Sequence, residues 1–361
     1  MTIISTLGSH SALDVCDGAK AEGFRTLVVC QRGREKTYAK YYKTRKRGKD
    51  EVGIVDEILL VDKFKEIVEQ KNQKLLTDQK AIFVPNRSFA VYVGYDSIEK
   101  DFNVPVFGNK YLLRAEERDA PKNQYFLLKE AGIDSPRTVK PEEIEFPVLV
   151  KVNEAGRSYE RAFFFAASHD EYIEKSESLL KRGVINEEGL KKARIEEFVL
   201  GAQFNFNFFY SPLKGELELL GIDMRRQTNL DGVLRLPAQQ QMEVLKHERL
   251  TTVEVGHIAC TLRESLLEKV FDAGEKFVAA VKKHYKNGII GPFALQSALE
   301  EKEGKERIVV FDVSFRMPGS PGTRFTPYSE YLFRKSIGFG RRIAIEIKEA
   351  EKAKEIERIT T

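Results

Sequence analysis

Two apolar segments in the last third of the chain carry side chains that could bind a metal ion. The segments 291–296 and 308–316 flank a short charged stretch, so the pattern predicts an antiparallel β-hairpin. Gln296 and Asp312 would place an amide oxygen and a carboxylate on its two strands, with Arg316 close behind. Mg²⁺ prefers oxygen ligands and is often held beside nucleotide phosphates. The hairpin therefore indicates an enzyme that acts on a nucleotide, although a hairpin whose polar groups only face water would look the same.

A second group of charged residues suits a triphosphate. One predicted strand ends at Lys151, which could neutralise phosphate charge, and the polar loop 153–161 follows it. Such a loop could close over the phosphates and exclude water. A later strand carries Glu196 and Glu197, and the backbone around Val199 continues it. These groups could bond the amino group of an adenine and the hydroxyls of a ribose.

The start of the chain predicts a parallel sheet that positions a further polar pair. The segments 2–7 and 26–30 read as strands, and 12–22 reads as an amphipathic helix between them, which makes a βαβ unit. Ser9 and His10 follow the first strand. Ligands of such sheets bind beyond the carboxyl ends of the strands, and the amides at a helix start suit a phosphate.

Size and charge restrict the class of protein. With 361 residues, 42% hydrophobic and 32% charged, the chain is long enough for two or three subdomains. A formal net charge of +4 is too small for a nucleic-acid surface that covers the whole protein. The three cysteines lack metal-ligand spacing, and no apolar run is long enough to cross a bilayer. We expect a soluble, cytoplasmic enzyme that binds no membrane.

The segment 31–50 is densely basic and contains Tyr38, Tyr41 and Tyr42. Basic residues interleaved with aromatic ones could bind a nucleic acid. We favour the simpler interpretation of a solvated surface loop or insertion, so a nucleic-acid partner is not expected.

The sequence also resembles a known family over nearly its whole length. The motifs that carry the resemblance are TLGSHS at 6–11, GAKAEGF at 18–24, FGN at 107–109, FYSPL at 209–213, ELLG at 218–221, RESLL at 263–267 and IGPFALQ at 290–296. They are similar to those of the FAICAR synthetases (PurP family), archaeal ATP-grasp enzymes of purine biosynthesis that formylate AICAR with free formate. The resemblance implies an α/β (α+β) ATP-grasp fold with an N-terminal Rossmann-like domain.

The implied domains are a Rossmann-like preATP-grasp domain at 1–112 with the basic insertion at 31–50, a small lid subdomain with its entry helix at 113–201, and a C-terminal subdomain with the metal site at 202–361. Some of the expected site residues are carried over from matching family positions and others follow from the residue reasoning above; Gln227 and Asp312 stand where the family has glutamate. His10, Ser88 and His257 would bind the AICAR nucleotide, although the family usually has asparagine at the last. The others are Lys151, Glu196, Glu197, Val199 and Gln227 for ATP, Gln296 and Asp312 for the metal, and Arg316 for catalysis.

The implied reaction is the activation of formate to formyl phosphate by ATP, followed by attack of the AICAR amine. The expected cofactors are ATP and Mg²⁺, with Mn²⁺ as a possible substitute, and the expected assembly is a homo-oligomer. Departures from the family pattern leave two alternatives open. Asn86, Arg87 and His257 change the acceptor pocket, which would fit a ligase with another carboxylate or amine acceptor. The loop 154–161 keeps only Gly156 of a glycine-rich sequence, which would fit a non-catalytic nucleotide-binding paralogue.

Overall fold

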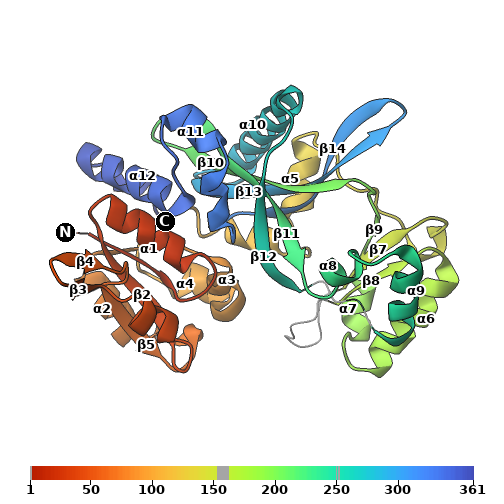
Figure 1. Ribbon diagram of the computed structural model, residues 1–361, viewed down its shortest axis with the longest axis horizontal. Helices are drawn as coiled ribbons and strands as arrows, with labels where there is room; N and C mark the ends of the chain where they lie inside the picture. The colour runs from red at the N-terminus through yellow and green to blue at the C-terminus, as the bar shows by residue number, and fades with distance from the viewer. Residues whose placement is uncertain (1, 153–161, 249, 251–252) are drawn as a thin grey trace.

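A parallel sheet forms the first part of the computed structural model, which describes residues 2–152, 162–248, 250 and 253–361 (Figure 1). Strands β1 (Ile3–Leu7), β2 (Arg25–Gln31), β5 (Glu57–Val61) and β6 (Ala81–Phe83) pair in parallel in the order β5-β2-β1-β6. β1 and most of β2 are buried and mainly apolar, as expected for strands of a parallel sheet with helices on both faces. The predicted βαβ start is confirmed.

Helices cover both faces of this sheet. They are α1 (Ala12–Ala21), α2 (Gln70–Asp78), α3 (Arg87–Val93) and α4 (Tyr95–Lys100), with a 3-10 helix at Phe64–Val68. Ile3 and Leu27 pack on one side with the 3-10 helix and α2. Ile4 and Ile82 pack on the other side with α1 and with the last long helix of the chain, α12 (Phe339–Ala353).

α12 lies against α1 although the two helices are far apart in sequence (Figure 1). Their backbones touch at Gly18 and Gly340. A Cβ atom at Gly18 would lie 2.0 Å from the backbone nitrogen of Arg341, and one at Gly340 would lie 1.9 Å from the carbonyl oxygen of Asp14. After α12, the backbone of Thr361 exchanges hydrogen bonds with Val106. The C-terminal segment thus packs against the first domain. The predicted boundaries between the three domains stay a prediction.

The basic segment is folded rather than a loop. It contains a short π-helix (Thr37–Tyr41) and the hairpin of β3 (Arg45–Arg47) and β4 (Asp50–Val52), and Tyr38 is buried in a small core with Cys16 and Cys30. Of the predicted solvated surface loop or insertion, the loop is therefore wrong and the insertion stays a prediction, while most of the charged side chains lie on the surface as expected.

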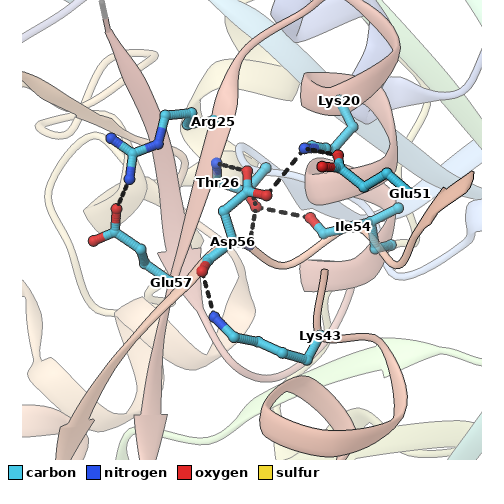
Figure 2. A network of polar contacts seen from close by, with 8 residues as sticks. All are labelled: Lys20, Arg25, Thr26, Lys43, Glu51, Ile54, Asp56 and Glu57. Atoms are coloured by element: carbon cyan, nitrogen blue, oxygen red, sulfur yellow. Dashed lines mark hydrogen bonds and ion pairs between the residues drawn. The ribbon is translucent and has the colours of Figure 1, made fainter. Parts of the chain in front are cut away.

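Figure 2 shows how the chain after this hairpin is anchored to the sheet. The Asp56 carboxylate accepts from the backbone N–H of Thr26 at 2.9 Å and from Lys20 Nζ at 3.0 Å. Thr26 Oγ1 donates to the carbonyl oxygen of Ile54 at 2.7 Å, and Lys43 Nζ donates to the carbonyl oxygen of Asp56.

A small antiparallel sheet forms the lid region. Its strands are β7 (Val148–Lys151), β8 (Phe163–Ala166) and β9 (Arg194–Glu197) in the order β8-β7-β9, with α6 (His169–Lys181) and α7 (Glu187–Lys191) between β8 and β9. Its own core includes Val150, Phe164, Tyr172 and Ile195.

A five-stranded antiparallel sheet occupies the middle of the molecule (Figure 1). Its strands are β10 (Ala202–Ser211), β11 (Glu216–Gln227), β12 (Glu254–Cys260), β13 (Gly291–Lys302) and β14 (Lys305–Ser314), in the order β12-β11-β10-β13-β14. Helices α8 (Leu230–Val233) and α9 (Ala238–His247) join β11 to β12, and α11 (Tyr328–Phe333) follows β14. One face carries Phe206, Phe293 and Val313 and packs against α5 (Gln124–Glu130) and α10 (Leu267–His284). Because side chains alternate along each strand, the residues between these point to the opposite face, and many of them are polar.

The entry helix that we predicted for the lid subdomain is shorter than the segment that leads to the lid. The structure has a 3-10 turn at Leu113–Glu116, and α5 begins only at Gln124. Pro121 lies in the break between them. The Asn123 side chain caps α5 by accepting hydrogen bonds from the backbone N–H groups of Tyr125 and Phe126. In the part of the chain that the structure describes, none of the helices has the length and apolar character needed to cross a lipid bilayer.

Candidate active site

Gln296 and Asp312 stand directly opposite each other on β13 and β14. From the hairpin turn to the pair of Ser297 and Val310, each residue of β13 pairs with the next residue of β14 without interruption. A β-bulge then leaves Phe311 out of the pairing, and this extra residue brings Asp312 opposite Gln296. Directly opposite side chains point to the same face of a sheet, and both residues line one cavity, which we call the junction cavity. The structure therefore brings the two residues together, while their role as metal ligands stays a prediction.

A second cavity, the sheet-face cavity, lies between the polar face of the five-stranded sheet and the first domain. The sheet contributes Asp223, Arg225 and His257, and the first domain contributes His10 and Arg87. His10 follows β1 and Arg87 opens α3 after β6, so both lie beyond the carboxyl ends of parallel strands. Burial, and then the charge of Arg87, lower the pKa of His10 and so favour its neutral form.

His257 is held between two carboxylates. Its Nδ1 bonds Asp223, and its Nε2 lies 2.8 Å from Glu254. Burial opposes the charged form of the ring, but the bonds to Asp223 and Glu254 outweigh it and raise the pKa of His257 to about 9. Burial likewise disfavours ionised Glu254, but its bond to His257 and the charge of Arg225 lower its pKa to about 2. Both ring nitrogens are thus occupied by protein groups, so His257 reaches a ligand only if Glu254 or Asp223 moves.

The raised pKa predicts a pH-dependent contribution of His257 to stability. A histidine with a folded-state pKa near 9 and an unfolded value of 6.5 stabilises the protein fully below pH 6.5, and the contribution disappears as the pH rises through 9. We expect wild type to lose about 3 kcal/mol more unfolding free energy than His257→Asn between pH 6.5 and 9.5. Urea unfolding of both proteins across this range measures the difference.

The matched control is His247→Asn, because His247 lies on α9 with an exposed side chain. Its pH dependence should equal that of wild type. Equal slopes for wild type and His257→Asn would show that the ring carries no raised pKa.

The hairpin cavity lies between the lid sheet and β14, and Leu149, Lys151, Glu197 and Val199 line it. Lys151 Nζ pairs with Glu196 and donates to the carbonyl oxygen of Phe311 at 3.0 Å, one residue before Asp312. The predicted lysine therefore lies next to the predicted metal pair.

Glu196 also lines the hairpin cavity, as we predicted, but its carboxylate is engaged by protein groups. Its side chain is 2% exposed and pairs with both Lys151 and Arg194. A buried carboxylate with two cationic partners positions those partners, so its direct contact with a nucleotide stays a prediction. Glu197 and Val199 line the hairpin cavity as the prediction requires.

Arg316 lies where the junction cavity and the sheet-face cavity meet, and it lines both. Its Nη2 pairs with Glu116 at 3.2 Å, and Glu116 also accepts from the backbone N–H of Phe315 at 2.8 Å. Burial, and next the charge of Arg316, lower the pKa of Arg87. This part of the site concentrates positive charge and suits anionic ligands.

For two predicted residues and one predicted loop, the structure gives less direct support for a place in the site. Ser88 is buried and its hydroxyl donates to Ser9 Oγ at 2.6 Å, beside His10. Gln227 ends β11, where its backbone N–H donates to Asp231, and it does not line the three cavities named above. The predicted phosphate-covering loop 153–161 lies outside the described residues.

Asn86 does not change the pocket as we predicted. Its side chain caps α3 by accepting from the N–H of Phe89, and it donates to the carbonyl oxygen of Leu7 at 2.9 Å. It thereby fixes α3 to the end of β1, and of the three substituted positions only Arg87 and His257 line the sheet-face cavity.

Sequence reasoning missed Arg225 and Glu254. Arg225 Nε lies 2.8 Å from Glu254, and its Nη2 donates to Gln296 Oε1. Arg225 and Asp223 alternate on β11 with apolar or exposed neighbours, and this alternation was the only local signal for a polar sheet face.

The donor set of Gln296 and Asp312 fits a hard cation that shares its coordination with phosphates. Mg²⁺ at nucleotide sites takes one or two protein carboxylates and completes its octahedron with phosphate oxygens and water. Within the described residues, no three His, Cys, Asp or Glu side chains form a metal cluster, so an all-protein cage is not seen there.

Comparison with known proteins relates this site to enzymes of known name. The family model described as "Domain of unknown function (DUF1297)" matches residues 171–361, and the one described as "Protein of unknown function (DUF1246)" matches residues 4–139. The chain is 39% identical over 363 residues to the 5-formaminoimidazole-4-carboxamide-1-(beta)-D-ribofuranosyl 5'-monophosphate synthetase of Methanobrevibacter smithii, which covers 99% of this chain and 94% of the relative. The enzyme of the same name from Methanopyrus kandleri is 38% identical over 359 residues with the same coverage.

Solved structures show the same architecture. The crystal structure of an IMP biosynthesis protein PurP from Thermococcus kodakaraensis matches with a TM-score of 0.74 and 29% identity, and covers 99% of this chain and 100% of that chain. Phosphoribosylamine–glycine ligase from Thermotoga maritima matches with a TM-score of 0.55 at 16% identity, over 89% and 70% of the two chains, which concerns the fold alone. The predicted ATP-grasp fold is confirmed.

Proposed function

Because the chain belongs to the FAICAR synthetases of the ATP-grasp superfamily, we propose that it joins formate to the amine of AICAR at the cost of ATP. A formate oxygen bonds to the γ-phosphorus as the bond between that phosphorus and the β–γ bridging oxygen breaks, and ADP leaves. The amine nitrogen then bonds to the formyl carbon, the bond from that carbon to the phosphate oxygen breaks, and the amine proton leaves with phosphate. The observation that carries this proposal is 38–39% identity over 99% of the chain to enzymes with this name.

The arrangement of the cavities supports the proposal. The hairpin cavity has apolar walls beside Lys151 and suits a purine base and its phosphates. The junction cavity holds Gln296, Asp312 and Arg316, and the sheet-face cavity beyond it holds His10. A nucleotide, a small carboxylate and an amine acceptor could thus meet in a line, which is the order that the chemistry requires.

We assign roles on this basis. Lys151, Glu197 and Val199 would bind ATP, Gln296 and Asp312 would hold Mg²⁺, and Arg316 would stabilise the transferred phosphoryl group. Bound there, Mg²⁺ would neutralise charge on the phosphate oxygens. His10 and Ser88 would bind AICAR, whereas Glu196 would hold Lys151 in place.

The direct test is an assay of the purified protein with ATP, Mg²⁺, formate and AICAR. We expect stoichiometric ADP and FAICAR, with no ADP when formate is omitted. ADP release without FAICAR would contradict the proposed acceptor.

A ligase of the same chemistry with another acceptor is the second candidate. It is favoured by Arg87 in the sheet-face cavity and by the engagement of both ring nitrogens of His257. A screen of phosphorylated amines for acceptor-dependent ADP release separates the two candidates.

His10→Ala is expected to weaken AICAR binding by about 1–3 kcal/mol, because a hydrogen bond to a charged or strongly polar ligand group is lost. ATP binding should stay within twofold of wild type, since His10 lies in the sheet-face cavity and not in the hairpin cavity. Calorimetry with each ligand measures both affinities. An equal loss for the two ligands would contradict the assignment.

We further propose a cytoplasmic homo-oligomer that uses small-molecule substrates. Light scattering on the eluting protein would test the assembly, and a mass of one 41.3 kDa chain would contradict it.

A further inference from the structure

Arg225 occupies the wall that the sheet-face cavity and the junction cavity share. It lines both cavities together with Arg87, Gln296 and Arg316. If ATP enters from the hairpin side and the acceptor lies at the sheet face, the reacting carboxylate has to lie between them. The position of Arg225 is therefore the position where a small carboxylate would meet both partners.

The guanidinium of Arg225 is held in one orientation. Its Nε lies 2.8 Å from Glu254, and its Nη2 donates to Gln296 Oε1. Glu254 is fixed in turn by His257 at 2.8 Å. A guanidinium has five N–H donors; the bond to Gln296 uses one of them, and the contact with Glu254 is an ion pair in which Nε makes no hydrogen bond. The fork geometry suits bidentate binding of a carboxylate, and the fixed orientation reduces the entropy lost on binding.

The surrounding charges favour an anion at this point. Arg87, Arg225 and Arg316 come from α3, β11 and the chain after β14, and they meet at the boundary of the two cavities. Glu254 pairs with Arg225, and Glu116 pairs with Arg316. Within the described residues, Arg87 has no carboxylate at ion-pair distance, although the charges of Glu254 and Glu116 act on it, so an entering anion would be its direct partner.

We propose that Arg225 is a catalytic residue that binds the carboxylate co-substrate and then the carbonyl oxygen of the acyl phosphate. This inference rests on the proposed function. In the first step its N–H groups orient the formate oxygens, one of which bonds to the γ-phosphorus while ADP leaves. In the second step they stabilise the negative charge that develops on the formyl oxygen as the amine attacks, before phosphate departs with the amine proton.

The test measures ADP release against formate concentration at saturating ATP and AICAR. Arg225→Gln should lower kcat/KM for formate by about 100-fold, because two hydrogen bonds to a charged group are lost. Arg225→Lys should lower it by about 10-fold, since it keeps the charge but not the fork. The affinity for ADP, measured by calorimetry, should stay within threefold of wild type for both variants, because Arg225 does not line the hairpin cavity.

Arg226→Gln is the matched control. Arg226 is the next residue on β11, it points to the opposite face, and it pairs with Asp231 at 3.0 Å. It should leave kcat/KM for formate within twofold of wild type, and thermal melting checks the folding of all three variants. A folded Arg225→Gln or Arg225→Lys protein with wild-type formate dependence would overturn the inference, as would an equal loss for formate and for ADP.

The outcomes also separate this inference from the proposed function. If wild type uses another small carboxylate, the assignment of formate is wrong, and the same 100-fold loss for that carboxylate in Arg225→Gln would still support Arg225. If none of the tested carboxylates supports ADP release by wild type, the proposed function is wrong and the inference is overturned with it.

Discussion

Asp312→Asn should reduce the turnover on the order of 10³-fold while the protein folds like wild type. A metal ion among phosphate oxygens stabilises the transition state by several kcal/mol, and each 1.36 kcal/mol corresponds to a factor of ten. The substitution keeps the shape of the side chain but removes the charge opposite Gln296. ADP release at saturating substrates gives the turnover, and a titration with Mg²⁺ should show that the variant needs a higher concentration.

The same substitution on the surface provides the control. Asp272 lies on α10, and its carboxylate pairs with Lys276 at 2.7 Å in an exposed position. Asp272→Asn should keep the turnover and the Mg²⁺ dependence of wild type. Turnover of Asp312→Asn within a few-fold of wild type would remove this residue from the metal site.

Arg342→Met should lower the free energy of unfolding by about 3–5 kcal/mol, the cost of breaking a buried ion pair by removing one partner. Arg342 is fully buried and donates two hydrogen bonds to Glu218, at 2.6 and 2.8 Å, and one to Glu346 at 2.9 Å. The substitution leaves both carboxylates buried without their cation. Urea unfolding measures the loss.

Two further variants identify the cause. Arg341→Met changes the neighbouring residue, whose pair with Glu22 is partly exposed, and should cost less than about 1 kcal/mol. The triple variant Arg342→Met, Glu218→Gln, Glu346→Gln should recover a large part of the loss, because it removes the unpaired charges. A triple variant as unstable as Arg342→Met would indicate that packing against Phe209 is what matters.

The parts of the fold with short-range signals could be predicted from sequence. The apolar runs of β1 and β2 predict buried parallel strands, and the apolar segments around the turn at 303–304 predict the hairpin. The pairing of Gln296 with Asp312 is different. Regular pairing from that turn would place Phe311 opposite Gln296 and direct Asp312 to the other face, so the pairing depends on a bulge that no simple pattern announces.

The polar network of the site could not be predicted, because its members meet only through tertiary structure. Arg225 and Gln296 are separated by 71 residues, and Arg316 reaches Glu116 across 200 positions. Asn86 is the reverse case, a residue that sequence reasoning assigned to the site without support from the structure. Its difference from the family pattern indicated a changed pocket, whereas the structure uses it as a helix cap between α3 and β1.

The backbone contact between α1 and α12 has a consequence for biosynthesis. The apolar side of α1, with Val15 and Ala19, is covered by residues that the ribosome makes more than three hundred positions later. The opening βαβ unit therefore cannot bury this side while the middle of the protein is being translated. Nascent chains shorter than about 340 residues should expose it to chaperones and proteases, so maturation of the first domain has to wait for the end of synthesis.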